Sequence, residues 1–215
     1  MIYKGIGGIL MNYYIDFDNT LYETAKLTKC MLEAICKTVS ECVDKSYEEM
    51  DIYVKENFNS TNDNIFTFAR ETGTKFGVNP DLVENSVKAV VDNGNHIVFE
   101  DAERFLARLK EKGHEVHILT YIPKTNQEYQ MKKLLGSGLM KYFDTITITS
   151  KYKFLLDMDY TNGIFIDDDP RDLNGLYEKN PIKVIRIRKP NNKRSKIDID
   201  NKDIEEFVSF DDIEV

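Results

Sequence analysis

The sequence predicts an α/β protein in which a Rossmann-like parallel sheet carries an all-helical domain inserted after its first strand. Two observations lead to this fold class. Short apolar segments typical of buried strands alternate with helical periodicity from residue 96 onward, whereas residues 22–95 show helical periodicity alone. Strands that alternate with helices form parallel sheets covered by helices on both faces. We therefore expect a core domain of residues 11–21 and 96–215 and a helical domain of residues 22–95.

The first strand of the core is expected at residues 12–16, where the apolar segment NYYID ends in an acid. The residues before it are apolar, but their apolar part is too short and too interrupted by glycine for a signal peptide. A second methionine, Met11, follows them directly. We treat residues 1–10 as a leader and assign it no role.

The inserted domain is predicted from apolar residues at helical spacing. Leu27, Met31, Ile35 and Val39 recur every four residues, which places them on one face of a helix. Proline at the first helical position marks the last helix of the insert, which begins at Asn79-Pro80. The three later helices of the insert are expected at residues 47–58, 63–76 and 80–92.

The core resumes after the insert as alternating strands and helices. The segments EVHILT, TITIT, GIFID and KVIRI have the length and the apolar content of short buried strands. They occupy residues 115–120, 145–149, 163–167 and 183–187. Helical segments precede or separate them, and are expected at residues 101–112, 123–135, a short stretch from 151, and 170–178.

Composition and charge exclude several classes of partner. The net charge of -8 opposes nucleic-acid binding, which usually needs a basic surface, and no apolar run approaches the roughly 20 residues that span a bilayer. Cys30, Cys36 and Cys42 lie in one predicted helix without sharing a face, so the sequence indicates neither a disulfide nor a zinc site and favours a reduced, cytoplasmic protein. One basic segment is expected to be a solvated strand edge and loop: Lys183, Arg186, Arg188, Lys189, Lys193, Arg194 and Lys196.

Polar residues follow four of the predicted strands at the point where each strand ends. They are the segment DFDNTL at residues 16–21, Thr120, the segment SKYK at residues 150–153, and DDDPRD at residues 167–172. Ligands of open parallel sheets bind outside the carboxyl ends of the strands, so these groups are expected to surround one crevice. Carboxylates crowded there need a cation, and Mg²⁺ prefers oxygen ligands of this kind.

These four groups, in this order, resemble the four motifs of the haloacid dehalogenase superfamily, and the insert resembles the helical class I cap of that superfamily. The resemblance covers the whole sheet domain. It implies a magnesium-dependent phosphatase that acts on a small phosphorylated metabolite, with the cap as a lid hinged near residues 21–24 and 94–98. A phosphoryl-transferring mutase of the same fold and a non-catalytic binding module are the alternatives.

The resemblance also assigns roles to individual residues. Asp16 matches the nucleophile that forms an aspartyl-phosphate. Asp18 matches the general acid and base, which the family's dehalogenases lack. Thr120 matches the phosphate-binding threonine. Lys151 is the first choice for the lysine that balances the charge of Asp16 and of the phosphoryl group, because it stands closer to the strand end, and Lys153 is the second choice.

The metal ligands implied by the resemblance are Asp16, the backbone carbonyl of Asp18, and Asp168, with Asp167 and Asp172 as second choices. Asp172 could instead orient Lys151 or a metal-bound water. Asp169 precedes a proline at a predicted helix start and is therefore expected to cap that helix rather than bind metal.

Overall fold

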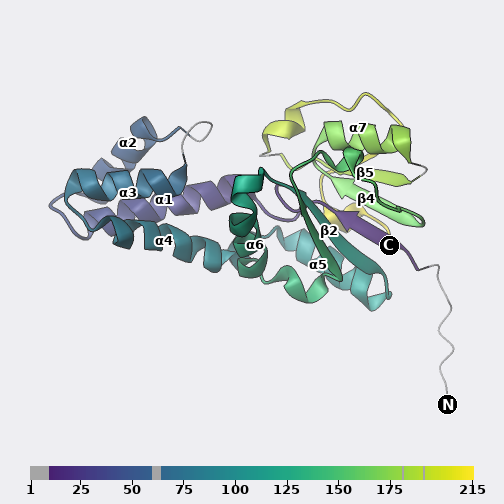
Figure 1. Ribbon diagram of the computed structural model, residues 1–215, viewed down its shortest axis with the longest axis horizontal. Coiled ribbons are helices and arrows are strands. Elements are labelled where there is room, and N and C mark those ends of the chain that lie inside the picture. The colour runs from purple at the N-terminus through teal and green to yellow at the C-terminus, as the bar shows by residue number, and fades with distance from the viewer. Residues whose placement is uncertain (1–9, 60–63, 181, 191) are drawn as a thin grey trace, which may run out of the picture. The chain divides into compact units, whose positions relative to one another are not determined.

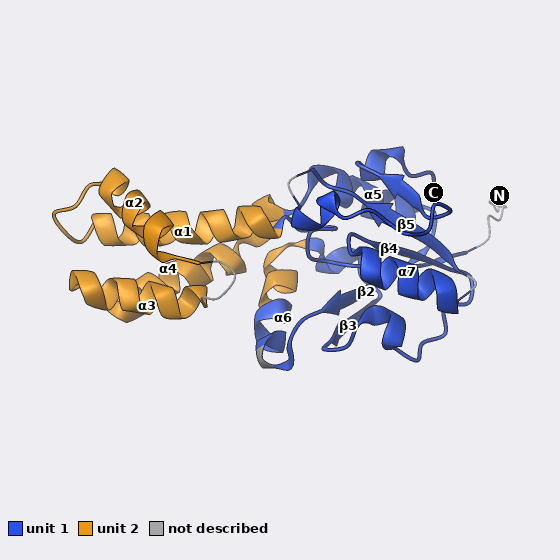
Figure 2. Ribbon diagram, turned by 90° about the horizontal axis from the view of Figure 1, so that it is seen from above, with its two compact units in different colours: residues 1–23, 98–131, 139–215 blue, residues 24–97, 132–138 orange. Residues whose placement is uncertain are grey.

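The computed structural model describes residues 10–59, 64–180, 182–190 and 192–215, so the expected leader lies outside the described residues except for Leu10. The chain forms two compact units, which Figure 2 colours separately. The core unit contains residues 10–23, 98–131 and 139–215, and the helical unit contains residues 24–97 and 132–138. None of the helices in the described part of the chain is both long and apolar enough to cross a bilayer.

The core unit is built on a six-stranded sheet with the strand order β3-β2-β1-β4-β5-β6. Every neighbouring pair of strands is parallel. This order matches the doubly wound Rossmann arrangement, so the fold class predicted from the sequence is confirmed. The strands are β1 (Asn12–Ile15), β2 (Glu115–Tyr121), β3 (Thr145–Thr149), β4 (Gly163–Asp167), β5 (Lys183–Ile187) and β6 (Glu205–Phe207).

Helices cover both faces of this sheet. α5 (Glu100–Glu111) and α7 (Pro170–Lys179) lie on opposite faces, as Figure 1 shows. One core cluster forms between α7 and the sheet, where Phe165, Leu173 and Leu176 are fully buried. Gly163 begins β4 because a Cβ there would lie 2.5 Å from the carbonyl oxygen of Tyr160. Burial of these apolar side chains holds the rigid sheet edge that carries the polar loops.

The helical unit contains α1 (Thr24–Ser40), α2 (Tyr47–Asn57), α3 (Ile65–Phe76) and α4 (Pro80–Asp92). The predicted apolar face of α1 is buried, and α4 packs against both α1 and α3. Each of the later helices begins at a side-chain cap: Ser46 forms a capping box with Glu49, and Asn64 and Asn79 accept backbone N–H groups. The helices expected in residues 22–95 therefore form, with ends within a few residues of the predicted ones.

The structure differs from the sequence-based expectations at three places in the core. The edge strand β6 was not expected, because a three-residue segment of sequence EEF carries no strand pattern and forms only by pairing with β5. α6 (Gln127–Gly136) starts four residues later than predicted, after a 3₁₀ turn. The helix expected from residue 151 is a single 3₁₀ turn, Lys153–Leu155.

Candidate active site

The polar groups that follow β1, β2, β3 and β4 meet at the carboxyl edge of the sheet. The register pairs Ile15 with Ile118 on one side and with Ile166 on the other. Asp16 therefore emerges beside Asp167, with Thr120 nearby on β2. The chain adds β2 and β3 on one side of β1, and β4 to β6 on the other. The carboxyl ends of β1 and β4 thus flank the topological switch point, where open α/β sheets bind ligands.

Lys153 forms the centre of a buried ion cluster at this edge. Its side chain is 2% exposed, and its Nζ lies 2.6 Å from Asp167 Oδ2 and forms an ion pair with Asp16 Oδ1. The second oxygen of Asp16 accepts a hydrogen bond of 3.1 Å from the hydroxyl of Thr20. Asp16 is therefore fixed by partners on both of its oxygens, and its side chain is only 5% exposed.

Burial changes the ionisation of these groups. Removal from water raises the pKa of Asp16 well above its ordinary value, and the nearby charges of Asp167 and Asp168 raise it further, against the attraction of Lys153. For Lys153 the desolvation works toward a lower pKa, but Asp16, Asp167 and Asp172 outweigh it and raise the pKa above its ordinary value. Lys153 is consequently charged, and the acids around it outnumber this single positive charge.

Three of these acids could hold a metal ion. Asp16, Asp167 and Asp168 are all buried, and each offers a carboxylate oxygen within 4.8 Å of those of the other two. Burial, followed by the charge of Asp167, raises the pKa of Asp168 to about 7. An all-oxygen set with surplus negative charge fits a hard divalent cation such as Mg²⁺.

The remaining acids of the β4 loop support this set rather than join it. Asp169 caps α7 through the N–H of Arg171 at 3.0 Å, as the sequence predicted. Asp172 accepts the backbone N–H of Lys153 at 2.8 Å and so holds the turn that points this lysine inward. Burial, and next the charge of Asp167, raises the pKa of Asp172 to about 6. Of the two second choices for the metal, only Asp167 belongs to the three-acid group.

The two candidate lysines lie in different environments, and the order of preference between them is reversed. Lys151 is exposed, and its backbone N–H is bonded to the hydroxyl of Thr149 in the turn after β3. Lys153, two residues later, is the one that contacts Asp16. Distance from the strand end was therefore the wrong criterion. The chain must first complete the turn before a side chain from this loop can point back to the sheet.

Thr120 and Asp18 are brought together by a residue that the sequence analysis did not single out. The side-chain amide nitrogen of Gln130 lies 2.7 Å from Asp18 Oδ2 and 2.8 Å from Thr120 Oγ1. Gln130 belongs to the part of α6 that lies in the core unit, and it is fully buried. Its position four residues before the buried Leu134, on the apolar face of a predicted helix, was the available signal.

The basic segment was also misjudged, because several of its members are not solvated. Arg186 is fully buried and donates to the carbonyl oxygens of Arg194 and Ile197 at 2.7 and 2.8 Å. This anchors a loop whose Asn192 and Arg194 both bond to Asp168, the latter at 3.2 Å. The segment therefore delivers an amide and a guanidinium to the acid group.

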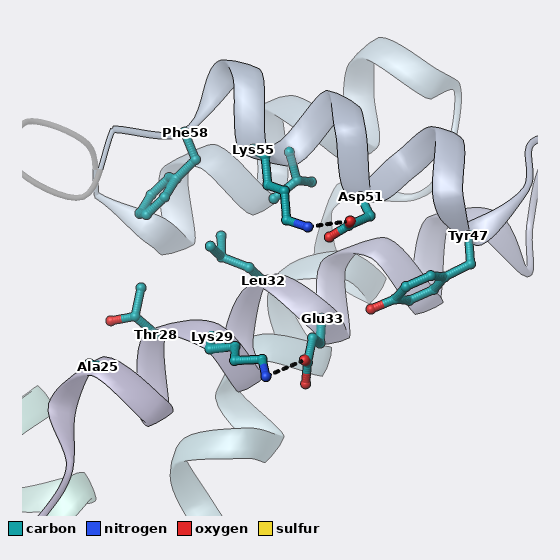
Figure 3. A pocket seen from close by; sticks show the side chains of 10 residues that line it. Ala25, Thr28, Lys29, Leu32, Glu33, Tyr47, Asp51, Lys55 and Phe58 are labelled. Atoms are coloured by element: carbon teal, nitrogen blue, oxygen red, sulfur yellow. Dashed lines mark hydrogen bonds and ion pairs between the residues drawn. The ribbon is translucent and has the colours of Figure 1, made fainter. Parts of the chain in front are cut away.

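Two cavities among the described side chains differ in character. A cleft of about 60 Å³ in the core unit is lined by Asp16, Asp18, Lys153, Arg171 and Arg194, among others. A larger cavity of about 580 Å³ lies between α1 and α2 of the helical unit (Figure 3). The charges along that larger cavity pair within each helix, Lys29 with Glu33 and Lys55 with Asp51. Of these two cavities, the smaller is the one lined by buried acids.

Comparison with known proteins shows the family of the chain. The model of a family described as haloacid dehalogenase-like hydrolase matches residues 14–154, which include Asp16, the insert and Lys153. The chain belongs to this family. Membership supports hydrolase or phosphotransferase activity. No curated protein matches the chain.

Several solved structures share the fold of this haloacid dehalogenase-like chain. A HAD phosphatase from Thermococcus onnurineus is 18% identical, with 94% of each chain covered and a TM-score of 0.54. A β-phosphoglucomutase from Clostridium difficile is 15% identical, with 96% of this chain and 94% of the other covered and a TM-score of 0.51. A 2-haloacid dehalogenase from Pseudomonas syringae pv. Tomato is 16% identical, with coverages of 94% and 95% and a TM-score of 0.53. At these identities only the fold is shared, and three different reactions are named among the proteins that have it.

Proposed function

We propose that this protein is a magnesium-dependent phosphatase that hydrolyses a small phosphate ester through an aspartyl-phosphate. The observation that carries the proposal is the buried carboxylate of Asp16, which is ion-paired to Lys153 and lies within one three-acid group with Asp167 and Asp168. An acid two residues after this carboxylate, Asp18, favours phosphoryl transfer over dehalogenation, because a halide leaves without a proton whereas an alkoxide needs one.

In the first step an oxygen of Asp16 attacks phosphorus, and the bond between phosphorus and the ester oxygen breaks. Asp18 gives its proton to the departing oxygen, which leaves as an alcohol. In the second step Asp18, now ionised, takes a proton from water as the water oxygen attacks the phosphorus of the aspartyl-phosphate. Inorganic phosphate leaves, and both carboxyl groups return to their starting states.

The other residues stabilise charge during these steps. Lys153 favours the ionised form of Asp16 and opposes the negative charge that gathers on the phosphoryl oxygens, an effect that is large in a site as dry as this one. Thr120 donates its hydroxyl hydrogen to a phosphoryl oxygen. Bound Mg²⁺, held by Asp16, the backbone carbonyl of Asp18 and Asp168, with Asp167 beside them, would supply the charge that balances carboxylates and phosphate.

The test is phosphate release from p-nitrophenyl phosphate with Mg²⁺, with a chelator, and after Asp16→Asn. The matched control is Asp157→Asn, at an exposed acid in the same unit. We expect Asp157→Asn to behave like the unaltered protein, while chelator and Asp16→Asn each abolish turnover. Equal turnover in all four samples would refute the proposal.

A mutase is the second candidate, because the β-phosphoglucomutase named above shares the fold and the same phosphoryl-aspartate chemistry would serve both reactions. The two differ in what accepts the phosphoryl group from Asp16. Supplying a phosphorylated sugar and following isomerised sugar phosphate against free phosphate separates them. Predominant release of free phosphate supports hydrolysis, and predominant isomerisation supports the mutase.

A further inference from the structure

Gln130 connects two groups of the proposed reaction that come from different strand ends. Its amide nitrogen is within hydrogen-bond distance of both Asp18 Oδ2, at 2.7 Å, and Thr120 Oγ1, at 2.8 Å. An amide NH₂ group carries two hydrogens, so a single nitrogen can serve both acceptors at once. The side chain is fully buried, so these contacts are shielded from water.

The bond to Thr120 determines what the threonine hydroxyl can do. A hydroxyl has one hydrogen to donate and two lone pairs that accept. Because Gln130 donates to this oxygen, it occupies a lone pair and leaves the hydroxyl hydrogen for another acceptor. Thr120 is thereby prepared to donate to a phosphoryl oxygen.

The bond to Asp18 holds one oxygen of that carboxyl group. Oδ2 accepts from Gln130, and a proton carried on Oδ2 would have to displace this donor. The same bond restricts rotation of the carboxyl group. Gln130 thereby helps to fix the orientation in which Asp18 meets a leaving group.

The carbonyl oxygen of the Gln130 amide indicates that this residue has a role beyond stabilising the fold. Gln130 Oε1 is buried and has no hydrogen-bond partner among the described residues. If the amide were turned end for end, Oε1 would face Asp18 Oδ2, and two acceptors would oppose each other. An apolar side chain of similar length would avoid the unpaired oxygen altogether, which is the more stable choice for a buried site.

We propose that Gln130 is a positioning residue that holds Asp18 for proton donation and Thr120 for phosphate binding, so that it matters most for esters with poor leaving groups. This inference rests on the proposed phosphatase function. An alkoxide leaving group needs the proton of Asp18, whereas p-nitrophenolate leaves readily without it. Loss of the Gln130 contact, which displaces Asp18, should therefore lower activity on an alkyl phosphate while most of the activity on the aryl phosphate remains.

The experiment compares Gln130→Met with Gln127→Met, a glutamine that is exposed at the start of the same helix. Each variant is assayed with Mg²⁺ on glycerol phosphate and on p-nitrophenyl phosphate. General acid–base groups typically contribute about 10²- to 10⁴-fold, so we expect Gln130→Met to lose roughly 10- to 100-fold in kcat on the alkyl ester. On the aryl ester the loss should stay below about 3-fold, because p-nitrophenolate needs little protonation by a general acid in order to leave.

Asp18→Asn calibrates this comparison, since it removes the acid itself. Once Asp18→Asn is in place, adding Gln130→Met should cost little more on the alkyl ester, because coupled residues are not additive. If Gln130→Met does not fold, as judged by its circular dichroism, Gln130→Glu keeps the size of the side chain while replacing the donating nitrogen by an acceptor. It is expected to show the same preference for the aryl ester.

The outcomes separate this inference from the function on which it rests. Equal losses on both esters, or no loss on either, in a protein whose unaltered form is active would overturn the role of Gln130 and leave the phosphatase intact. An unaltered protein that is inactive on both esters with Mg²⁺ would overturn the function and this inference together.

Discussion

Replacing Lys153 by methionine tests the electrostatic design of the site most directly. The substitution keeps the aliphatic part of the side chain and removes only the ammonium group. That group is 2% exposed and contacts carboxylates of Asp16 and Asp167 that are themselves buried. After its removal those carboxylates, with Asp168 and Asp172 next to them, have lost the central positive charge of the cluster.

The size of the effect follows from this burial. Breaking a buried ion pair by removing one partner costs about 3–5 kcal/mol of the free energy of unfolding. In a chain of this length, 1 kcal/mol shifts the melting temperature by about 2–4 °C, so the expected decrease is roughly 6–20 °C. The pKa of Asp16 is already raised by burial, so uptake of a proton relieves part of the strain, and the loss should be smaller at pH 6 than at pH 8.

The assay is thermal unfolding followed by circular dichroism, in chelator and then in Mg²⁺, together with phosphate release. Lys151→Met is the matched control, because Lys151 is exposed in the same loop, and its melting temperature should change by no more than about 2 °C. For Lys153→Met we expect the large decrease in chelator, partial recovery in Mg²⁺, and a loss of about 10²- to 10³-fold in kcat. Similar results for the two lysine variants would refute the assignment of Lys153.

Three further predictions concern the nucleophile, the acids and the helical unit. Asp16→Asn should remove phosphate release while the circular dichroism spectrum stays unchanged, because the amide keeps the shape of the side chain but is a far poorer nucleophile. The raised pKa values of Asp168, about 7, and Asp172, about 6, mean that the folded protein holds these protons more tightly than the unfolded chain. Melting temperatures in chelator should therefore fall as the pH rises from about 5 to about 8, and saturating Mg²⁺ should flatten the decrease. The lowered pKa of His114 opposes this fall below about pH 6.5, and the lowered pKa values of Asp101, Asp144 and Asp169 oppose it near pH 4. Gly136→Ala should lower the free energy of unfolding by about 1–3 kcal/mol in denaturant titrations, since its Cβ would overlap the carbonyl oxygen of Val91 in α4.

The fold could be predicted from the sequence because its signals are local. Five of the six strands are short apolar segments, and the insert carries helical periodicity, caps and breaks that each lie within a few residues. The exception is β6, whose residues Glu205–Phe207 have no strand pattern of their own. Its conformation is imposed by pairing with β5, which is a tertiary effect.

Within the site, positions at strand ends were predictable but side-chain directions were not. Asp16 and Asp168 could be placed because a strand fixes where its last residue emerges. Lys151 and Lys153 share one loop, and only the turn stabilised by Asp172 decides which of them points inward. Gln130 lies on a helix face that packs against the site, and its role depends on the neighbours that the fold supplies.

The charge balance of the site arises from residues that no single motif contains. The β4 loop and Asp16 together supply five buried carboxyl groups, and three cations reach them from separate segments. These five buried acids therefore outnumber the three cations, and a divalent cation would reduce the excess of negative charge. The raised pKa values of Asp16, Asp168 and Asp172 have the same origin, because protonation removes negative charge that a cation could balance instead. Proton binding and metal binding therefore compete at these acids. The expected pH dependence of stability and the proposed requirement for Mg²⁺ follow from one physical cause, the excess of buried carboxylates over the cations Lys153, Arg171 and Arg194.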